Sequence, residues 1–464
     1  MPSRQDQLHS YQFMVQRVVG ALVMRETDPA QSPFRRAAGA TLASMLVALI
    51  AVGGAVLYGL FVGGGATKWK EPNVVIVEKE SGAQYVYLDG KLRPVVNYTS
   101  ALLIVGKGSQ AKTVSVSRKS LEGATRGAPV GIPNAPDSLA PRNRLITKEW
   151  TVCSGPRSGA QAAQSALLIG RTAPGGTPMG DDALLALHPS GSLYLVWHNR
   201  RHLIRDKQLV VSALGLNGHR QVPVAPALLN ALPAGADLAQ VSVAGAGQPS
   251  QVVADARVGD VFYVEPPGGV RQYMVVKADG LATITELQSS LLVAGLGQQG
   301  DPERMSQGTY ANTTKSDDLL PPDEGAPPAT IPKIVASESS VVCADVQDDS
   351  GVKQVRVGAD LPDLANTTET TARSPQGAGL ADHVLVTPGS GVVVEAAASP
   401  GATGGAISVV TDLGQRHAVA NADVLGSLGY GGVRPVRMPA SLVSLVPTGP
   451  ALNPEAARNT PGQQ

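Results

Sequence analysis

A long apolar stretch close to the start of the chain constrains the fold more than any other feature. Residues 42–62 (LASMLVALIAVGGAVLYGLFV) are almost continuously apolar, and residues 37–67 carry no charge. As an α-helix, 21 residues extend about 31 Å, which matches the hydrocarbon core of a bilayer at roughly 30 Å. A cleaved signal peptide would have a shorter apolar stretch after a short basic start, and buried core helices rarely run this long without a polar face. The sequence therefore predicts a retained transmembrane helix bounded by Leu42 and Val62.

The charges that flank this stretch predict its orientation. Arg35 and Arg36 lie directly before it, after three further arginines, whereas only Lys68 and Lys70 follow closely. Cytoplasmic flanks carry the excess of Lys and Arg. We expect a cytosolic N-terminus and about 400 residues on the other side of the membrane.

Composition narrows the class of the large C-terminal part. The chain is 43% apolar, which excludes wholesale disorder, and its net charge of +1 disfavours a nucleic-acid binder. With 52 Gly, 35 Pro and only 16% charged residues, short strands and many turns are favoured over long helices. The expected fold class is a β-rich α+β domain behind a single N-terminal membrane helix.

The segment before the span predicts an amphipathic helix from Asp6 to Arg25. Apolar residues recur at helical spacing from Leu8 to Leu22, and Asp6 could cap the start. Such a helix could rest on the inner leaflet or dock on a cytosolic partner, and we favour docking. The candidate docking residues are Tyr11, Phe13, Arg17 and Leu22.

Four stretches of the C-terminal part share one pattern, a hairpin followed by a short helix that ends near Gly. The hairpins begin near Tyr85, Leu193, Tyr273 and Ile407. One hairpin with one helix buries little surface, so the copies must pack on one another or on a core. Asp206, Thr285 and Asn421 are expected to cap the helices of the last three copies. The predicted repeats are residues 67–120, 191–238, 239–298 and 401–446.

The two cysteines, Cys153 and Cys343, predict a disulfide. An even count in an oxidising compartment, with no C-x-x-C motif, favours a bridge over a metal site. The bridge would join a core segment at residues 121–190 to another at 333–400. We expect these two segments to form a central core with the four repeats around it.

The remaining segments are predicted to be flanks and linkers. Residues 1–36 form the cytosolic helix and basic flank, and residues 37–66 contain the span and a Gly63–Gly65 hinge. Residues 299–332 are a Pro-rich surface loop, and residues 447–464 a disordered tail.

A search for catalytic motifs yields no candidate. Gly106-Lys107 lacks the preceding Gly and following Ser/Thr of a phosphate-binding loop, and no G-x-S-x-G occurs. His198 and His202 have the spacing of a helical zinc pair but flank a predicted turn, so a solvated turn is expected. We predict no catalytic residue, no cofactor and no metal.

Several local motifs together resemble the EccB family, the single-pass component of the mycobacterial type VII (ESX) secretion membrane complex. The cytosolic Tyr11-Gln12-Phe13 with Arg17 is similar to that family's helix before the span. Residues 85–106 are similar to its first repeat, residues 131–136 (GIPNAP) to its GIPGAP segment, and residues 150–153 (WTVC) to its W-x-x-C. The resemblance extends over nearly the whole chain.

This resemblance implies a structural subunit of a secretion complex. It implies association with EccC-, EccD- and EccE-like membrane subunits and a mycosin-type protease, and self-association of the periplasmic domains. Family members sometimes carry an ATPase label, which the missing phosphate-binding loop and the short cytosolic part argue against. One alternative is a periplasmic module that binds cell-wall polymers, but it would need exposed aromatic residues along a groove, and 17 aromatic residues in 464 make it poor. The other is a periplasmic hydrolase with an unrecognised site.

Overall fold

The computed structural model describes residues 3–25, 33–62, 68–106, 111–157, 159, 162–297, 300–319, 325–365, 367–371, 373–374, 377 and 379–462, with side chains of the second helix described over residues 38–58. It has two compact units. One comprises residues 1–92 and 112–126, and the other residues 93–111 and 127–464. The predicted Gly hinge lies outside the described residues.

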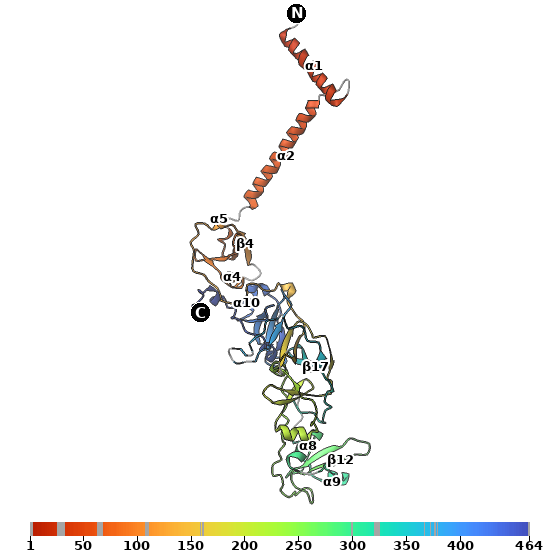
Figure 1. Ribbon diagram of the computed structural model, residues 1–464. Helices are drawn as coiled ribbons and strands as arrows, with labels where there is room; N and C mark the ends of the chain where they lie inside the picture. The colour runs from red at the N-terminus through yellow and green to blue at the C-terminus, as the bar shows by residue number, and fades with distance from the viewer. Residues whose placement is uncertain are drawn as a thin grey trace. The chain divides into compact units, whose positions relative to one another are not determined.

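The first unit begins with two helices, α1 (Arg4–Met24) and α2 (Pro33–Val62) (Figure 1). Helix α2 contains all of the predicted span, and its segment Ala38–Tyr58 has a mean hydropathy of 2.3 with none of it buried in the protein. This length and composition suit a bilayer crossing. Helix α1 begins two residues earlier than predicted because Ser3, not Asp6, is the N-cap. Asp6 instead completes a capping box by accepting from the Ser3 amide.

Four small sheets have the same topology, which confirms the predicted repeats. In each, three antiparallel strands lie in the order third, second, first, and a fourth strand that follows the helix joins the first in parallel. In the first two repeats the strands are β1 (Val74–Glu78), β2 (Gln84–Leu88), β3 (Lys91–Pro94) and β4 (Lys112–Val116), then β8 (Leu184–Leu187), β9 (Leu193–Trp197), β10 (Arg200–Ile204) and β11 (Val222–Pro223). In the last two they are β12 (Val261–Val264), β13 (Gln272–Val276), β14 (Leu281–Ile284) and β15 (Glu303–Arg304), then β19 (Val392–Ala397), β20 (Ala406–Val410), β21 (Arg416–Val419) and β22 (Val436–Pro439).

A short helix follows the third strand of each repeat. These helices are α4 (Tyr98–Val105), α6 (Lys207–Ala213), α8 (Glu286–Gly295) and α10 (Ala422–Leu425). The side chains of Thr285 and Asn421 accept from the amides of Gln288 and Val424, as predicted. The predicted cap at Asp206 is wrong: its backbone is left-handed at φ 42°, and its side chain makes no capping hydrogen bond. The other helices are α5 (Arg118–Leu121), α7 (Pro226–Ala231), α9 (Gln307–Asn312), α11 (Ala440–Val443), α12 (Pro454–Arg458) and the one-turn elements Arg142–Arg144 and Gly426–Tyr430.

Each repeat closes with an extended stretch that we call its return segment, because the chain comes back to run parallel to the third strand. The return segments are residues 125–130, 233–238, 314–316 and 447–452. In repeats 1, 2 and 4 two bridges hold the segment, at Leu92/Arg126 and Val95/Val130, at Arg201/Ala234 and Ile204/Leu238, and at Arg416/Thr448 and Val419/Leu452. In repeat 3, Leu281 bridges Lys315. This pairing covers what would otherwise be an exposed sheet edge.

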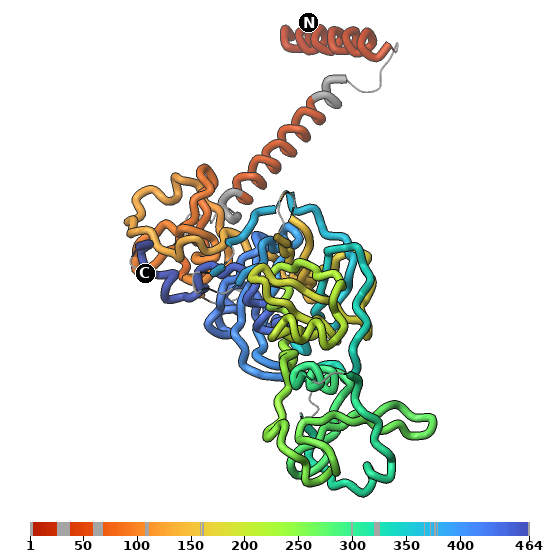
Figure 2. Tube along the Cα trace, turned by 60° about the horizontal axis from the view of Figure 1, so that its bottom comes forward, coloured from red at the N-terminus to blue at the C-terminus, as the bar shows by residue number. Residues whose placement is uncertain are grey.

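A six-stranded sheet forms the predicted central core of the second unit. Its order is β18 (His383–Leu385), β6 (Ala163–Ile169), β5 (Trp150–Pro156), β16 (Val342–Asp348), β17 (Gly351–Ala359) and β7 (Gly175–Pro178), so strands from both predicted core segments meet at β5 and β16. Trp150, Leu167 and Leu228 are fully buried in one cluster with side chains of repeats 2 and 4. Helix α7 packs on β5 and β6. Repeat 3 forms a lobe of its own, drawn in green (Figure 2).

Three predicted boundaries differ from the structure. Strands β8 and β19 belong to repeats 2 and 4 rather than to the core segments, because each pairs with the strand that follows it, Leu187 with Leu193 and Ala396 with Ala406. The predicted Pro-rich loop contains β15 and α9, which complete repeat 3. The prediction of a disordered tail after residue 447 is wrong up to residue 462, since Leu452 and Ala457 are fully buried and α12 forms there. Burial of Leu452 and Ala457 stabilises an ordered structure despite the polar composition of this segment.

Candidate functional site

The predicted docking residues lie on α1 with their side chains in solvent. Tyr11, Phe13 and Leu22 are 69%, 66% and 75% exposed. Their neighbours Leu8, Val15 and Val18 are also exposed. So many apolar side chains in water are unfavourable, and they suit contact with a membrane surface or a protein partner.

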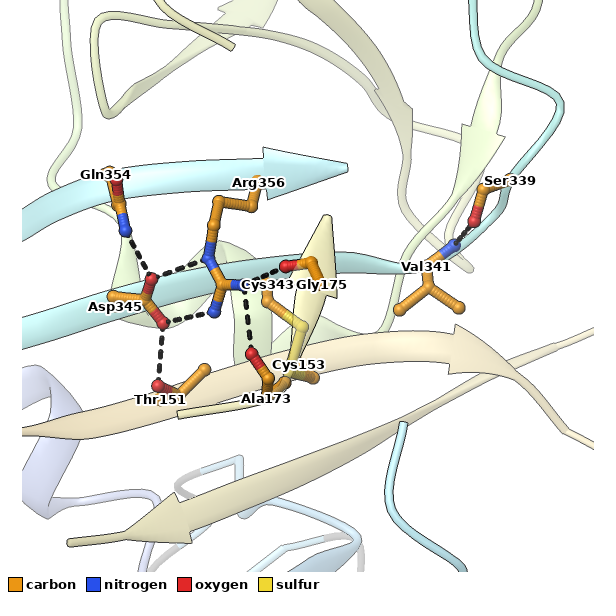
Figure 3. Close-up of a disulfide and its surroundings, with 10 residues drawn as sticks. All are labelled: Thr151, Cys153, Ala173, Gly175, Ser339, Val341, Cys343, Asp345, Gln354 and Arg356. Atoms are coloured by element: carbon orange, nitrogen blue, oxygen red, sulfur yellow. Dashed lines mark hydrogen bonds and ion pairs between the residues drawn. A yellow bond between two sulfur atoms is a disulfide. The ribbon is translucent and has the colours of Figure 1, made fainter. Parts of the chain in front are cut away.

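The disulfide lies in the middle of the central sheet. Cys153 on β5 and Cys343 on β16 are register partners, both fully buried, and their sulfur atoms are bonded at 2.06 Å (Figure 3). Ala166, Leu168 and Leu385 pack around them. The pair therefore holds together two segments that are 190 residues apart in sequence.

A buried ion pair between Asp345 and Arg356 lies next to the disulfide, because Asp345 is two residues from Cys343 along β16 (Figure 3). Asp345 accepts from the Arg356 guanidinium at 2.8 and 3.0 Å and from the Thr151 hydroxyl at 2.7 Å. Arg356 also donates to the carbonyl oxygens of Ala173 and Gly175. Burial alone would raise the pKa of Asp345, but hydrogen bonds from Arg356, Thr151 and Gln354 outweigh it and lower the pKa. Because each polar group is satisfied, the network fixes the register of β16, β17 and the end of β7 without being a reactive site.

The two histidines at zinc spacing have different surroundings. His198 is in the hairpin turn, stacked on Trp197, with Nε2 at 2.8 Å from Asp181 Oδ1. His202 is fully buried, and its Nδ1 faces the carbonyl oxygen of Ala236 at 2.8 Å. The described residues contain no group of three or more His, Cys, Asp or Glu side chains placed to hold a metal. This histidine pair is part of a strand and its turn.

A matched histidine–glycine contact was not predicted from the sequence. His202 on β10 packs on Gly235, and His417 on β21 packs on Gly449. A Cβ at either glycine would lie 2.2 or 2.3 Å from the ring. The signal was present in the sequence, since PAGADL (233–238) and PTGPAL (447–452) share the pattern P-x-G-x-x-L. Repeat 1 places Arg93 on Gly127 at the same position.

A polar groove of about 580 Å³ lies in repeat 3 beside helix α6 of repeat 2, whose Ser212 and Ala213 also line it. Tyr263 and Tyr273 face each other across β12 and β13 with ring centroids 6.2 Å apart, and Arg271 lies over the Tyr263 ring at 4.6 Å. Glu286 and Asp301 also line it. Both tyrosine side chains are half-buried. This groove has the aromatic and polar lining that a polysaccharide-binding module would need.

Comparison with known proteins gives one consistent family. The family model described as "Type VII secretion system ESX-1, transport TM domain B" matches residues 1–462. The ESX-3 secretion system ATPase EccB3 of Mycolicibacterium smegmatis is 29% identical over 473 residues, covering 96% of this chain and 88% of the relative. The ESX-2 secretion system ATPase EccB2 of Mycobacterium tuberculosis is 29% identical over 450 residues, covering 91% and 88%.

Solved structures agree with the sequence relatives. A chain of an intact ESX-5 inner membrane complex superposes with a TM-score of 0.66 at 25% identity, covering 100% of this chain and 96% of that one. A chain of the EccB3 dimer from the ESX-3 core complex superposes with a TM-score of 0.62 at 29% identity, covering 83% and 100%. From the membrane helix to the fourth repeat, the resemblance that the sequence motifs indicated is thus confirmed: this chain belongs to the EccB family of type VII secretion systems.

Proposed function

We propose that this chain is a structural subunit of a type VII secretion inner-membrane complex. It anchors the complex through α2 and associates with other copies of itself through its periplasmic repeats. The family match over residues 1–462 carries this proposal, and the similarity to chains of an ESX-5 inner membrane complex and an EccB3 dimer supports it.

The proposed orientation has α1 in the cytosol and the four repeats in the periplasm. The arginine-rich N-terminal flank supports it, as does the disulfide, because a buried bridge is typical of a domain folded outside the reducing cytosol. Protease added to spheroplasts should therefore digest the repeats and leave α1 protected. Protection of the C-terminal part would contradict this orientation.

The proposed partners are EccC-, EccD- and EccE-like membrane subunits and a mycosin-type protease. Purification through a C-terminal tag in mild detergent should recover these subunits with the chain. Recovery of the chain alone would contradict the proposal. A matched control is Leu49→Arg, which places a charge near the middle of α2 and should reduce membrane insertion and partner recovery together.

The exposed apolar side chains of α1, which lie on both sides of the helix, form the proposed docking surface for a cytosolic part of the complex. Tyr11→Ala with Phe13→Ala should reduce recovery of cytosolic partner domains, whereas Gln16→Ala, also at an exposed position, should not. If the double variant and the control both retain partners, and an isolated α1 peptide binds anionic vesicles, the helix rests on the membrane instead.

We propose that the chain is not the ATP-hydrolysing motor, although its relatives are named ATPases. The sequence has no complete phosphate-binding loop, which supports this proposal. Purified full-length chain should show no ATP hydrolysis above the protein-free rate. A rate abolished by one point mutation would overturn this.

The groove with Tyr263 and Tyr273 supports a second candidate, a module that binds cell-wall polymer. Sedimentation with insoluble peptidoglycan should then carry down the wild-type periplasmic part, and Tyr273→Ala should weaken this, whereas Tyr310→Ala in the neighbouring α9 should not. Equal sedimentation of all three proteins would rule out the groove as the site.

A further inference from the structure

Two buried histidines lie under the return segments of repeats 2 and 4. The His202 ring, fully buried, has Nδ1 at 2.8 Å from the Ala236 carbonyl oxygen, and the His417 ring, 2% exposed, has Nδ1 at 3.0 Å from that of Pro450. A ring nitrogen facing a carbonyl must carry the hydrogen, so the other nitrogen, Nε2, is unprotonated in the neutral ring. In His202 this Nε2 is buried with no hydrogen-bond partner among the described residues.

Protonation of either ring would be unfavourable in the closed arrangement. It would add a charge and a second N–H where the surroundings of His202 provide no acceptor. Burial lowers the pKa of His202 and of His417. Around His202 the nearby charges are Arg200 on its own strand, which opposes protonation, and Asp237 on the return segment, which favours it but is paired with Arg205 at 2.6 Å.

Among the described residues, no neighbour of His417 adds a compensating carboxylate. The cause that lowers its pKa is burial, opposed only by the Pro450 carbonyl. Arg416, the adjacent residue on β21, donates to the carbonyl oxygen of Val446 at 3.0 Å and so also ties the start of the return segment. The return segment covers the His417 ring so closely that Gly449 leaves no room for a side chain.

We propose that the return segments of repeats 2 and 4 are acid-sensitive clasps that open from β10 and β21 when His202 and His417 take up protons. Opening breaks the hydrogen bonds from the Gly235 and Leu238 amides to Arg201 and Leu203, and those from the Gly449 and Leu452 amides to Arg416 and Ala418. It exposes both ring nitrogens to water, which solvates the charge. The proposal rests on contacts within this chain. Its physiological relevance depends on the proposed periplasmic placement.

Opening of the clasp of repeat 4 would also affect helix α4 of repeat 1. Residue 452 leads directly into α12, which packs on α4, and the Gly131 amide donates to the Asn459 carbonyl oxygen at 3.2 Å. Release of residues 447–452 therefore removes the support for the α4 contacts within the second unit. Acid would loosen the helix of repeat 1 through a segment at the other end of the chain.

Repeats 1 and 3 provide internal controls because neither has a histidine at the matching position. Arg93 packs on Gly127 in repeat 1, and Ala282 lies beside the return segment that bridges Leu281 in repeat 3. Their return segments should keep the same opening equilibrium between pH 7.5 and 5.5.

Amide hydrogen exchange of the full-length protein in detergent tests the proposal. After correction for intrinsic exchange, opening of residues 233–238 and 447–452 should rise up to about tenfold from pH 7.5 to 5.5, because a solvated histidine titrates near pH 6.5. Residues 125–130 and 314–316 should not change. Equal changes in all four return segments, or none in the two with histidines, would overturn the proposal.

Two glutamine variants assign the effect to each ring. In His202→Gln the amide group can still donate to Ala236 but cannot titrate, so residues 233–238 should lose their pH dependence while 447–452 retain it. His417→Gln should give the reverse. If either variant fails to fold, the wild-type comparison among the four return segments still decides. Since no partner protein is needed, this result is independent of whether the chain assembles as proposed.

Discussion

Cys153 and Cys343 lie directly opposite each other on the antiparallel strands β5 and β16, with their Cα atoms 4.0 Å apart. They are 190 residues apart in sequence, and the whole of repeats 2 and 3 lies between them. The bond therefore closes a loop that contains two small domains and fixes both of its ends in the central sheet.

We predict that removal of this bond destabilises the periplasmic part strongly. For a loop of this length the chain-entropy model gives about 5 kcal/mol as an upper value. Urea unfolding of Cys153→Ala/Cys343→Ala should show a lower free energy of unfolding, and wild type in reductant should match it. A double variant as stable as oxidised wild type would contradict this.

The buried pair of Asp345 and Arg356 should behave differently from an exposed pair. Arg356→Met leaves the Asp345 carboxylate buried without its cation, and we expect a loss of about 3–5 kcal/mol. The double variant Arg356→Met/Asp345→Leu should recover part of this loss, because no unpaired charge remains. Arg205→Met, which breaks the exposed pair with Asp237, should cost less than about 1 kcal/mol.

The same carboxylate predicts an acid limb of stability. Because the folded-state pKa of Asp345 is lowered, its contribution is present above the unfolded value of about 3.9 and is lost as pH falls below that value. Between pH 5 and 3, the melting temperature of wild type should therefore fall more steeply with decreasing pH than that of Arg356→Met/Asp345→Leu. Parallel curves would show that this pair does not contribute.

Gly235 and Gly449 should tolerate no side chain. A Cβ there would overlap His202 or His417, so Gly235→Ala or Gly449→Ala should displace the return segment and cost about 1–3 kcal/mol. Gly308→Ala is the control, since it lies in α9, where a Cβ would make only an ordinary van der Waals contact with Ser306 Oγ at 3.9 Å, and it should be neutral or slightly stabilising. Thermal unfolding of the three variants measures the difference.

Helix α12 should support α4 through its buried face. Ala457→Asp places a charge at a fully buried position, whereas Arg458→Asp changes an exposed one. Hydrogen exchange of residues 98–105 should rise in the first variant and stay at the wild-type level in the second. Equal protection in both would show that α4 is stable without α12.

The local features of this chain could be predicted from its sequence because each has a local physical cause. Residues 42–62 are apolar over the thickness of a bilayer, and Thr285 and Asn421 are followed by amides that their side chains can reach. Hairpin turns reveal the second and third strands of each repeat. Two cysteines outside the cytosol predict a bridge before any geometry is known.

The tertiary structure alone decided what depends on contacts between distant residues. Strands β8 and β19 also pair with β11 and β22, the parallel strands that lie beyond the helix of each repeat, and the return segments pair with strands about 30 residues earlier. His202 is buried because Gly235 allows the backbone to cover its ring. Its sequence distance from the solvent-exposed His198 gave no indication of this difference. The tail is polar in composition, yet Leu452 and Ala457 are buried because the fourth and first repeats provide apolar surface for them, which no property of the tail itself could reveal.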